Sequence, residues 1–259
     1  MGIQSENLEV PDEIINLIIS DYTQEGGVRG LRKRLETLCR ASAVQIVRGK
    51  GEKVIVTRDN LRDLLDMHPV YHKQVKESAN PGIVTGLAWT AAGGEILYIE
   101  TMLTKGKGEI IITGQLGDVM KESARIAVTL VKSLFPEQTG VLEENDLHIH
   151  VPDGATPKDG PSAGITLTTA LSSLVTGIPV PPNIGMTGEI SLQGGVNPIG
   201  GLPEKLLAAQ RAGVKKVFIP ADNVDDLRDV PGEVKENLEI VPVTEASEVL
   251  RALGIMKDM

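Results

Sequence analysis

The residues with the clearest chemistry are a serine and a lysine, each at an expected helix start. Ser162 follows a tight Gly160-Pro161 turn and begins an apolar helical pattern over 162–176. Backbone N–H groups at a helix start lack an intrahelical partner, so they could stabilise an oxyanion beside this serine. Lys205 lies further along, in the first turn of an expected helix. The two residues predict a hydrolase with a Ser-Lys dyad rather than a Ser-His-Asp triad.

A Ser-Lys dyad requires a lysine that has lost its proton. Serine is a weak nucleophile until a base takes its proton, and an ammonium group cannot act as that base. The pKa of a free lysine is about 10.4, whereas a useful base has a pKa of about 7–8. Burial and the positive end of a helix dipole both lower a lysine pKa. The apolar neighbours of Lys205, which are Leu202, Leu206 and Leu207, could supply the burial.

Each motif also has a simpler interpretation when it is taken alone. A serine before a helix is commonly an N-cap, and a lysine near a helix start is commonly a solvated surface residue. The catalytic interpretation therefore depends on the two motifs occurring together.

Two parts of the chain differ in their patterning. Residues 1–66 are mostly helical in pattern and residues 67–80 form a linker, with a second domain over 81–259. The first part has helices expected from Pro11 and over 27–49, a strand over 54–57, and a short helix capped by Asp59-Asn60.

The second part alternates strands with helices, which is typical of an α/β or α+β fold. Strands are expected within 83–101, 109–113, 147–151, 185–192, 217–220 and 238–243, and helices over 117–135, 162–176, 203–212 and 245–253.

Composition limits the class of protein. The chain has 259 residues, 41% of them hydrophobic, and a formal net charge of −9, which argues against a dedicated nucleic-acid binder. Cys39 is the only cysteine, so neither an internal disulfide nor a cysteine metal cluster is expected. The chain shows no signal-peptide pattern and no apolar run long enough to span a membrane. We expect a cytoplasmic protein without membrane contact, with an organelle matrix as the alternative.

Longer motifs around these residues resemble the Lon protease family over most of residues 10–256. The serine motif extends from His150 to Gly164, and the lysine motif runs from Gly200 through Ala209. Further matching motifs are Met186-Thr187-Gly188-Glu189, Gly86-Leu87-Ala88-Trp89-Thr90 and Gly114 to Ala124. The resemblance implies an α/β (α+β) Lon-type proteolytic domain preceded by a small, mostly helical C-terminal subdomain of an AAA+ module.

The resemblance also implies roles for particular residues. Ser162 would be the nucleophile and Lys205 the general base. The hydroxyl of Thr187 could orient the lysine amine; the alternative is a strand threonine that pairs locally. Asp159 matches an acidic residue that gates the site, and as an isolated residue it is also a plain cap.

Two histidines and one arginine are further candidates, for lining the site and for contacting a nucleotide. His148 and His150 share one face of a strand, which favours a structural role lining the site; a metal site would need a third ligand that the spacing does not provide. Arg29 matches the sensor-2 position, where an arginine reaches nucleotide phosphates. The sequence has no Gly-x4-Gly-Lys-Ser/Thr phosphate loop, so this nucleotide site would be incomplete and the chain is interpreted as a fragment.

The family implies ATP-dependent degradation of unfolded or damaged proteins by a hexameric ring. Mg-ATP would serve the full-length enzyme, and no cofactor is expected in this fragment. The eight Lys and Arg residues within 28–53 suggest a solvated helix face, nucleotide contact or nucleic acid as a further partner. The competing hypotheses are a catalytically silent scaffold, which an intact serine and lysine disfavour, and a nucleotide-responsive adaptor.

Overall fold

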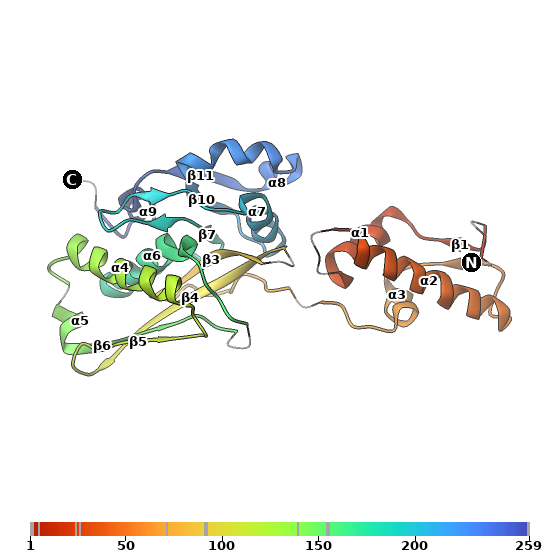
Figure 1. Cartoon of the computed structure of the whole chain (residues 1–259), viewed down its shortest axis with the longest axis horizontal. Helices are drawn as coiled ribbons and strands as arrows, with labels where there is room; N and C mark the ends of the chain where they lie inside the picture. The colour runs from red at the N-terminus through yellow and green to blue at the C-terminus, as the bar shows by residue number, and fades with distance from the viewer. Residues whose placement is uncertain are drawn as a thin grey trace. The chain divides into compact units, whose positions relative to one another are not determined.

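The computed structural model contains two compact units, which are described separately (Figure 1). The first unit comprises residues 1–72 and 91–93, and the second comprises 73–90 and 94–259. The structure describes residues 3–4, 6–23, 25, 27–70, 72–90, 93–138, 140–153 and 156–257. The predicted boundaries, with a helical domain over 1–66 and a linker over 67–80, stay a prediction.

The first unit is a small helical domain with one short pair of strands. Its helices are α1 (Asp12–Tyr22), α2 (Arg29–Val47) and α3 (Arg58–Leu65). Strand β1 (Leu8–Glu9) pairs in parallel with β2 (Val54–Ile55). The helices bury a shared apolar cluster, because their apolar residues recur at helical spacing. The expected helix-rich pattern is therefore present.

The cap of α3 differs from the expected Asp59-Asn60 pair. Thr57 is the N-cap, and its hydroxyl accepts a hydrogen bond from the Asn60 backbone at 3.4 Å. The Asn60 side chain accepts in turn from the Thr57 backbone N–H at 2.8 Å. This reciprocal capping box pairs two N–H donors that the helix itself leaves free.

The second unit is built on a seven-stranded mixed sheet of order β11-β10-β7-β3-β4-β6-β5. The pairs β11–β10, β10–β7, β7–β3 and β6–β5 are parallel, whereas β4–β6 is antiparallel. The strands are β3 (Ile83–Thr90), β4 (Gly93–Lys105), β5 (Ile110–Thr113), β6 (Asn145–His150), β7 (Ile184–Met186), β10 (Lys216–Pro220) and β11 (Glu239–Val243). A separate antiparallel pair is formed by β8 (Glu189–Ile190) and β9 (Val196–Asn197).

Both faces of the central strands β3 and β4 are buried. Along β4, Leu97 and Ile99 belong to one apolar cluster, and Ile96 and Tyr98 belong to another. Successive side chains of a strand point to opposite faces, so the two clusters lie on opposite sides of the sheet. This arrangement makes a three-layer α/β/α unit, and the predicted fold class is confirmed.

The helices of the second unit divide between the two faces. The first cluster contains residues of α4 (Asp118–Leu134), α6 (Gly164–Thr176) and α9 (Ala246–Ala252). The second contains residues of α7 (Leu202–Arg211) and α8 (Gly232–Asn237). The expected serine and lysine therefore begin helices on opposite faces of one sheet. The sequence analysis did not anticipate α8, the short α5 (Gly140–Glu144) or the 3₁₀ helix η2 (Ala221–Asp229).

Candidate active site

The serine lies in a tight turn rather than in the first turn of a regular α-helix. Ser162 is the middle residue of a 3₁₀ helix, η1 (Pro161–Ala163), which leads directly into α6. Gly160 precedes it with φ of 122°, a conformation that L-residues with a side chain rarely adopt. Pro161 then fixes the first dihedral of the turn. The result is a half-buried serine at the start of a buried helix.

The turn between β7 and β8 holds the backbone around this serine. The Gly188 N–H donates to the Ser162 carbonyl at 2.9 Å, and the Ile165 N–H donates to the Gly188 carbonyl at 3.1 Å. The Thr187 hydroxyl donates to the same Ser162 carbonyl at 3.4 Å. Three hydrogen bonds from one turn therefore fix the start of α6.

The lysine is buried on the opposite side of the sheet. Lys205 is in the first turn of α7, after Gly201, whose φ is 71°. Its side chain is among the largest that are fully buried, and the whole residue is 2% exposed. Burial disfavours the charged ammonium and lowers the pKa of Lys205 from 10.5 to about 8. A substantial fraction of this lysine is therefore neutral near physiological pH.

Thr187 connects the lysine to the serine turn. Lys205 Nζ donates to Thr187 Oγ1 at 3.1 Å, while that hydroxyl donates to the Ser162 carbonyl. In the part of the chain that the structure describes, no hydrogen bond joins Lys205 Nζ directly to Ser162 Oγ. One N–H of the amine is thus committed to the threonine.

Both residues open onto one cavity of about 680 Å³. Trp89 lies at its wall with 59% of its surface exposed. The described residues that line it are Trp89, Pro161, Ser162, Pro198, Ile199, Gly200, Gly201 and Lys205. A concave site with an apolar wall, a hydroxyl and a buried amine of lowered pKa has the features of an active site.

Comparison with known proteins agrees with this geometry. Residues 55–255 match the Lon protease (S16) C-terminal proteolytic domain, and residues 1–55 match the Lon protease AAA+ ATPase lid domain. The chain is 54% identical over 256 residues to the Lon protease of Clostridium beijerinckii, covering 98% of this chain and 32% of that protein. The Lon proteases of Methanosarcina barkeri and Bacillus thuringiensis are 49% and 50% identical, each over 96% of this chain and 32% of the relative.

The chain belongs to the Lon protease family. The predicted family is therefore confirmed, and so is the enzyme class, a peptidase of the S16 type, at the level of family. The chain spans about a third of the length of these relatives. The boundary between the two family matches, at residue 55, falls inside the first compact unit of the structure.

The predicted gating residue of the Lon site, Asp159, contacts a different helix. Its carboxylate accepts from the Met120 N–H at 3.0 Å and from the Gly160 N–H at 2.9 Å. The carboxylate also lies over Gly117, where an added Cβ would come within 2.2 Å of the Asp159 carboxyl carbon. Asp159 thus ties the serine turn to the start of α4, and its predicted gating role stays a prediction.

The two histidines lie together on β6 but not among the described residues that line the cavity. The hydroxyl of Thr113, on the neighbouring strand β5, is 2.9 Å from His148 Nε2 and 2.7 Å from His150 Nδ1. The two imidazole rings meet edge to face, with centroids 6.4 Å apart. Among the described residues, no group of three or more His, Cys, Asp or Glu side chains could hold a metal ion.

The predicted nucleotide sensor belongs to the helical unit. Arg29 is the first residue of α2 and is exposed. The start of α2 is capped by Glu25, whose carboxylate accepts from the N–H groups of Gly30 at 2.6 Å and Leu31 at 2.9 Å. These bonds lower the pKa of Glu25.

Within the described residues, no helix is both long enough and apolar enough to cross a membrane.

Sequence reasoning did not assign a role to two residues of the Lon site. Trp89 was part of a matching motif, yet only the fold shows that it reaches the cavity of Ser162 and Lys205. Gly188 was likewise part of a motif, and its backbone holds the serine turn. The single tryptophan of a chain with only 2% aromatic residues was the available signal for the first.

Proposed function

We propose that this chain is a serine endopeptidase in which Ser162 is the nucleophile and neutral Lys205 the general base. The observation that carries the proposal is the burial of Lys205 beside Thr187, in the cavity that Ser162 also lines. Burial supplies a base of suitable pKa, and a shared cavity supplies a place for the scissile bond.

The mechanism follows from the positions of these groups. Lys205 Nζ accepts the Ser162 hydroxyl proton as the serine oxygen attacks the carbonyl carbon of the substrate. Backbone N–H groups of the serine turn η1 would stabilise the tetrahedral oxyanion. Lys205 then returns the proton to the leaving amine, and water hydrolyses the acyl-enzyme by the reverse sequence.

We infer that the cavity takes an extended polypeptide. Strand β3 pairs with β7 through Thr85 and Gly86 and then continues to Trp89 at the cavity wall. Main-chain groups at the end of a strand can pair with an extended peptide, and Trp89 offers an apolar contact for its side chains. We infer that unfolded or damaged proteins are the substrates.

In a longer protein, we propose that proteolysis is driven by ATP. The match of residues 1–55 to an AAA+ lid domain supports this, because a lid is one part of a nucleotide-binding module. Mg-ATP would bind with further parts of that module, and Arg29 would contact its phosphates. The same proposal includes a hexameric ring that acts in protein quality control in the cytoplasm. It also includes the expectation that this chain alone does not hydrolyse ATP.

Turnover of a fluorogenic peptide and of an unfolded protein, without ATP, tests the proposal. Activity should fall to background in both Ser162→Ala and Lys205→Ala, because residues of one catalytic unit lose function together. Matched controls are Ser133→Ala and Lys235→Ala, at exposed positions on α4 and α8. Substantial turnover by Lys205→Ala would exclude the dyad, and a chain silent in both assays would favour the scaffold hypothesis.

A further inference from the structure

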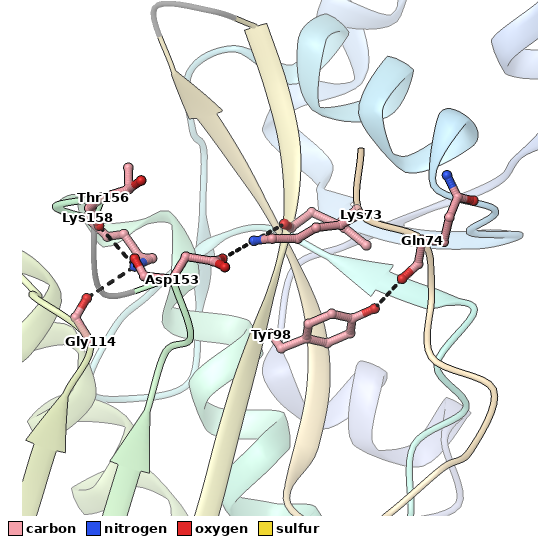
Figure 2. Close-up of polar contacts among 8 residues, drawn as sticks. Lys73, Gln74, Tyr98, Gly114, Asp153, Thr156 and Lys158 are labelled. Carbon is pink, nitrogen blue, oxygen red and sulfur yellow. Dashed lines mark hydrogen bonds and ion pairs between the residues drawn. The ribbon is translucent and has the colours of Figure 1, made fainter. Parts of the chain in front are cut away.

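A second lysine, Lys158, occupies the centre of the loop that leads to Ser162. Its ammonium donates to three backbone carbonyl oxygens: Asp153 at 2.7 Å, Thr156 at 3.0 Å and Gly114 at 3.2 Å. A lysine ammonium has three N–H donors, so all three are used. Figure 2 shows Lys158 beside Asp153 and Gly114. This carbonyl cluster plays no part in the mechanism proposed above.

The carbonyl cluster joins two chain segments that leave the sheet side by side. Strands β5 and β6 are parallel neighbours, and a bridge between Leu116 and Lys158 resumes their pairing after both have turned away. The Lys158 N–H donates to the Gln115 carbonyl at 3.1 Å, and the Gly117 N–H donates to the Lys158 carbonyl at 2.7 Å. Lys158 is therefore bonded through both its backbone and its side chain.

The backbone near the ammonium is unusual. Gln115 and Asp153 have φ of 56° and 71°, a region that residues other than glycine seldom occupy. Such conformations persist only where surrounding contacts hold them. The ammonium supplies those contacts, because it gathers carbonyl groups from both segments. Without it, those carbonyl groups would lose their shared partner.

An ion pair also holds Asp153, one of the residues of the carbonyl cluster. The Asp153 carboxylate pairs with the ammonium of Lys73, which also donates to the Ile96 carbonyl at 3.4 Å (Figure 2). The segment after Lys73 is held in turn: the Tyr98 hydroxyl donates to the Gln74 carbonyl at 2.8 Å. Two lysine ammonium groups therefore hold this loop. Lys158 binds its carbonyl oxygens, and Lys73 binds the Asp153 carboxylate.

We propose that Lys158 is a positioning residue that sets the place of Ser162, and this inference rests on the peptidase function proposed above. Only three residues separate the two, and Asp159 anchors the intervening turn to α4. Lys158 fixes one end of this turn, and Gly188 fixes the other. The Ser162 oxygen is then held in position to attack the carbonyl carbon of the substrate, so the loop does not have to change conformation first. Such pre-organisation raises kcat.

Chemical rescue tests the proposal. Lys158→Ala removes three carbons and the nitrogen, which are the atoms of n-propylammonium. We expect kcat to fall by about 10²-fold with KM unchanged, since a misplacement of about 1 Å has that effect. Added n-propylammonium should restore kcat saturably, because it returns N–H donors to the carbonyl groups. Tetramethylammonium, which has no N–H donor, should restore nothing.

Two further variants separate positioning from general damage. Lys158→Met keeps the side-chain length without donors, so it should show the same loss with no rescue, because its stem fills the space. Lys235→Ala is the matched control: this lysine donates to the single carbonyl of Leu227 at 3.2 Å on the surface. It should change neither kcat nor the response to amines.

Amide hydrogen exchange over residues 158–164 keeps the two proposals distinguishable. Exchange should be faster in Lys158→Ala than in the unaltered chain and should slow again with n-propylammonium, whether or not the chain cleaves peptides. Loss of all turnover in the unaltered chain would refute the peptidase proposal and leave this measurement to decide the positioning role. Unchanged exchange in Lys158→Ala, or full kcat in that variant, would overturn the positioning role.

Discussion

Lys205 and Lys158 are two lysines near the candidate active site whose ammonium groups have different hydrogen-bond partners. Burial is the main cause that lowers the pKa of each. Lys205 has one neutral hydroxyl as its partner, whereas Lys158 has three carbonyl oxygens, and the charge of Asp153 opposes the effect of burial. The comparison shows that burial lowers the pKa of a lysine and that a nearby carboxylate opposes this effect. One lysine is thereby suited to be a base and the other to be a fixed cation.

The largest expected effect is that of Lys205→Met. Turnover should fall to background, because no base remains. The variant should also be more stable at neutral pH, by on the order of 3 kcal/mol, since a buried ammonium with a pKa lowered from 10.5 to about 8 disfavours folding. Chemical denaturation of both proteins measures the difference.

The pH dependence of that stability gain provides the check. Between the folded pKa of about 8 and the ordinary value of 10.5, the unfolded chain binds more protons, so the unaltered protein becomes more stable as pH rises. The advantage of Lys205→Met is therefore complete below about pH 8 and disappears toward pH 10.5. A gain that did not change with pH would show that Lys205 is not strained by burial.

A smaller loss is expected for Thr187→Val. The lysine loses its hydroxyl partner and the serine turn loses one bond, so kcat should fall by about 10²-fold. Removal of an acceptor disfavours the ammonium further, and the apparent pKa should move lower. The pH–rate profile measures both changes. Thr187→Ser, which keeps the hydroxyl, is the control, and an equal loss in that variant would contradict the orienting role.

The unaltered chain should show a rate that rises with pH through about 8. Only the neutral lysine is a base, so roughly one-tenth of the enzyme is competent at pH 7, and kcat/KM should rise about tenfold to its plateau. Lys158→Met should retain this profile at a lower plateau, because Lys158 does not exchange a proton in the reaction. A pH–rate profile shifted along the pH axis in Lys158→Met would contradict the view that only Lys205 exchanges a proton in the reaction.

The smallest effect is expected for Lys73→Met, which removes the outer partner of Asp153. The Asp153 side chain is 43% exposed, and ion pairs of this kind contribute about 1 kcal/mol or less. Thermal unfolding should change little, and kcat should stay close to that of the unaltered chain. A loss as large as that of Lys158→Ala would place the main support of the loop outside it.

The sequence was sufficient for much of the fold and for the pair of catalytic candidates. Helix periodicity predicted α4 and α6 to within one or two residues, because apolar residues face a common core. Ser162 and Lys205 were predicted from local turn chemistry, and the structure brings both to one cavity. Each motif is contiguous and could be found locally, whereas the catalytic roles of the two residues stay a prediction.

Other features depend on tertiary contacts and could not be predicted in this way. Lys158 is an ordinary charged residue in the sequence, and only the parallel pairing of β5 and β6 brings three carbonyl groups around it. His148 and His150 were correctly placed on one strand face, but their shared hydroxyl comes from Thr113, on a strand distant in sequence. The prediction for the cap of α3 was wrong because Thr57, Asp59 and Asn60 lie within four residues and all are suitable caps.

The complete burial of α6 has a consequence for the timing of activity. Residues from Gly164 to Ser173 are all buried in this helix, which packs against α4, α9 and β3. A helix of 13 residues is marginal in water by itself, so α6 forms when the surrounding core forms. We therefore expect the serine turn at the start of α6 to form together with this core, so that a chain whose core is incomplete should lack the proposed active site.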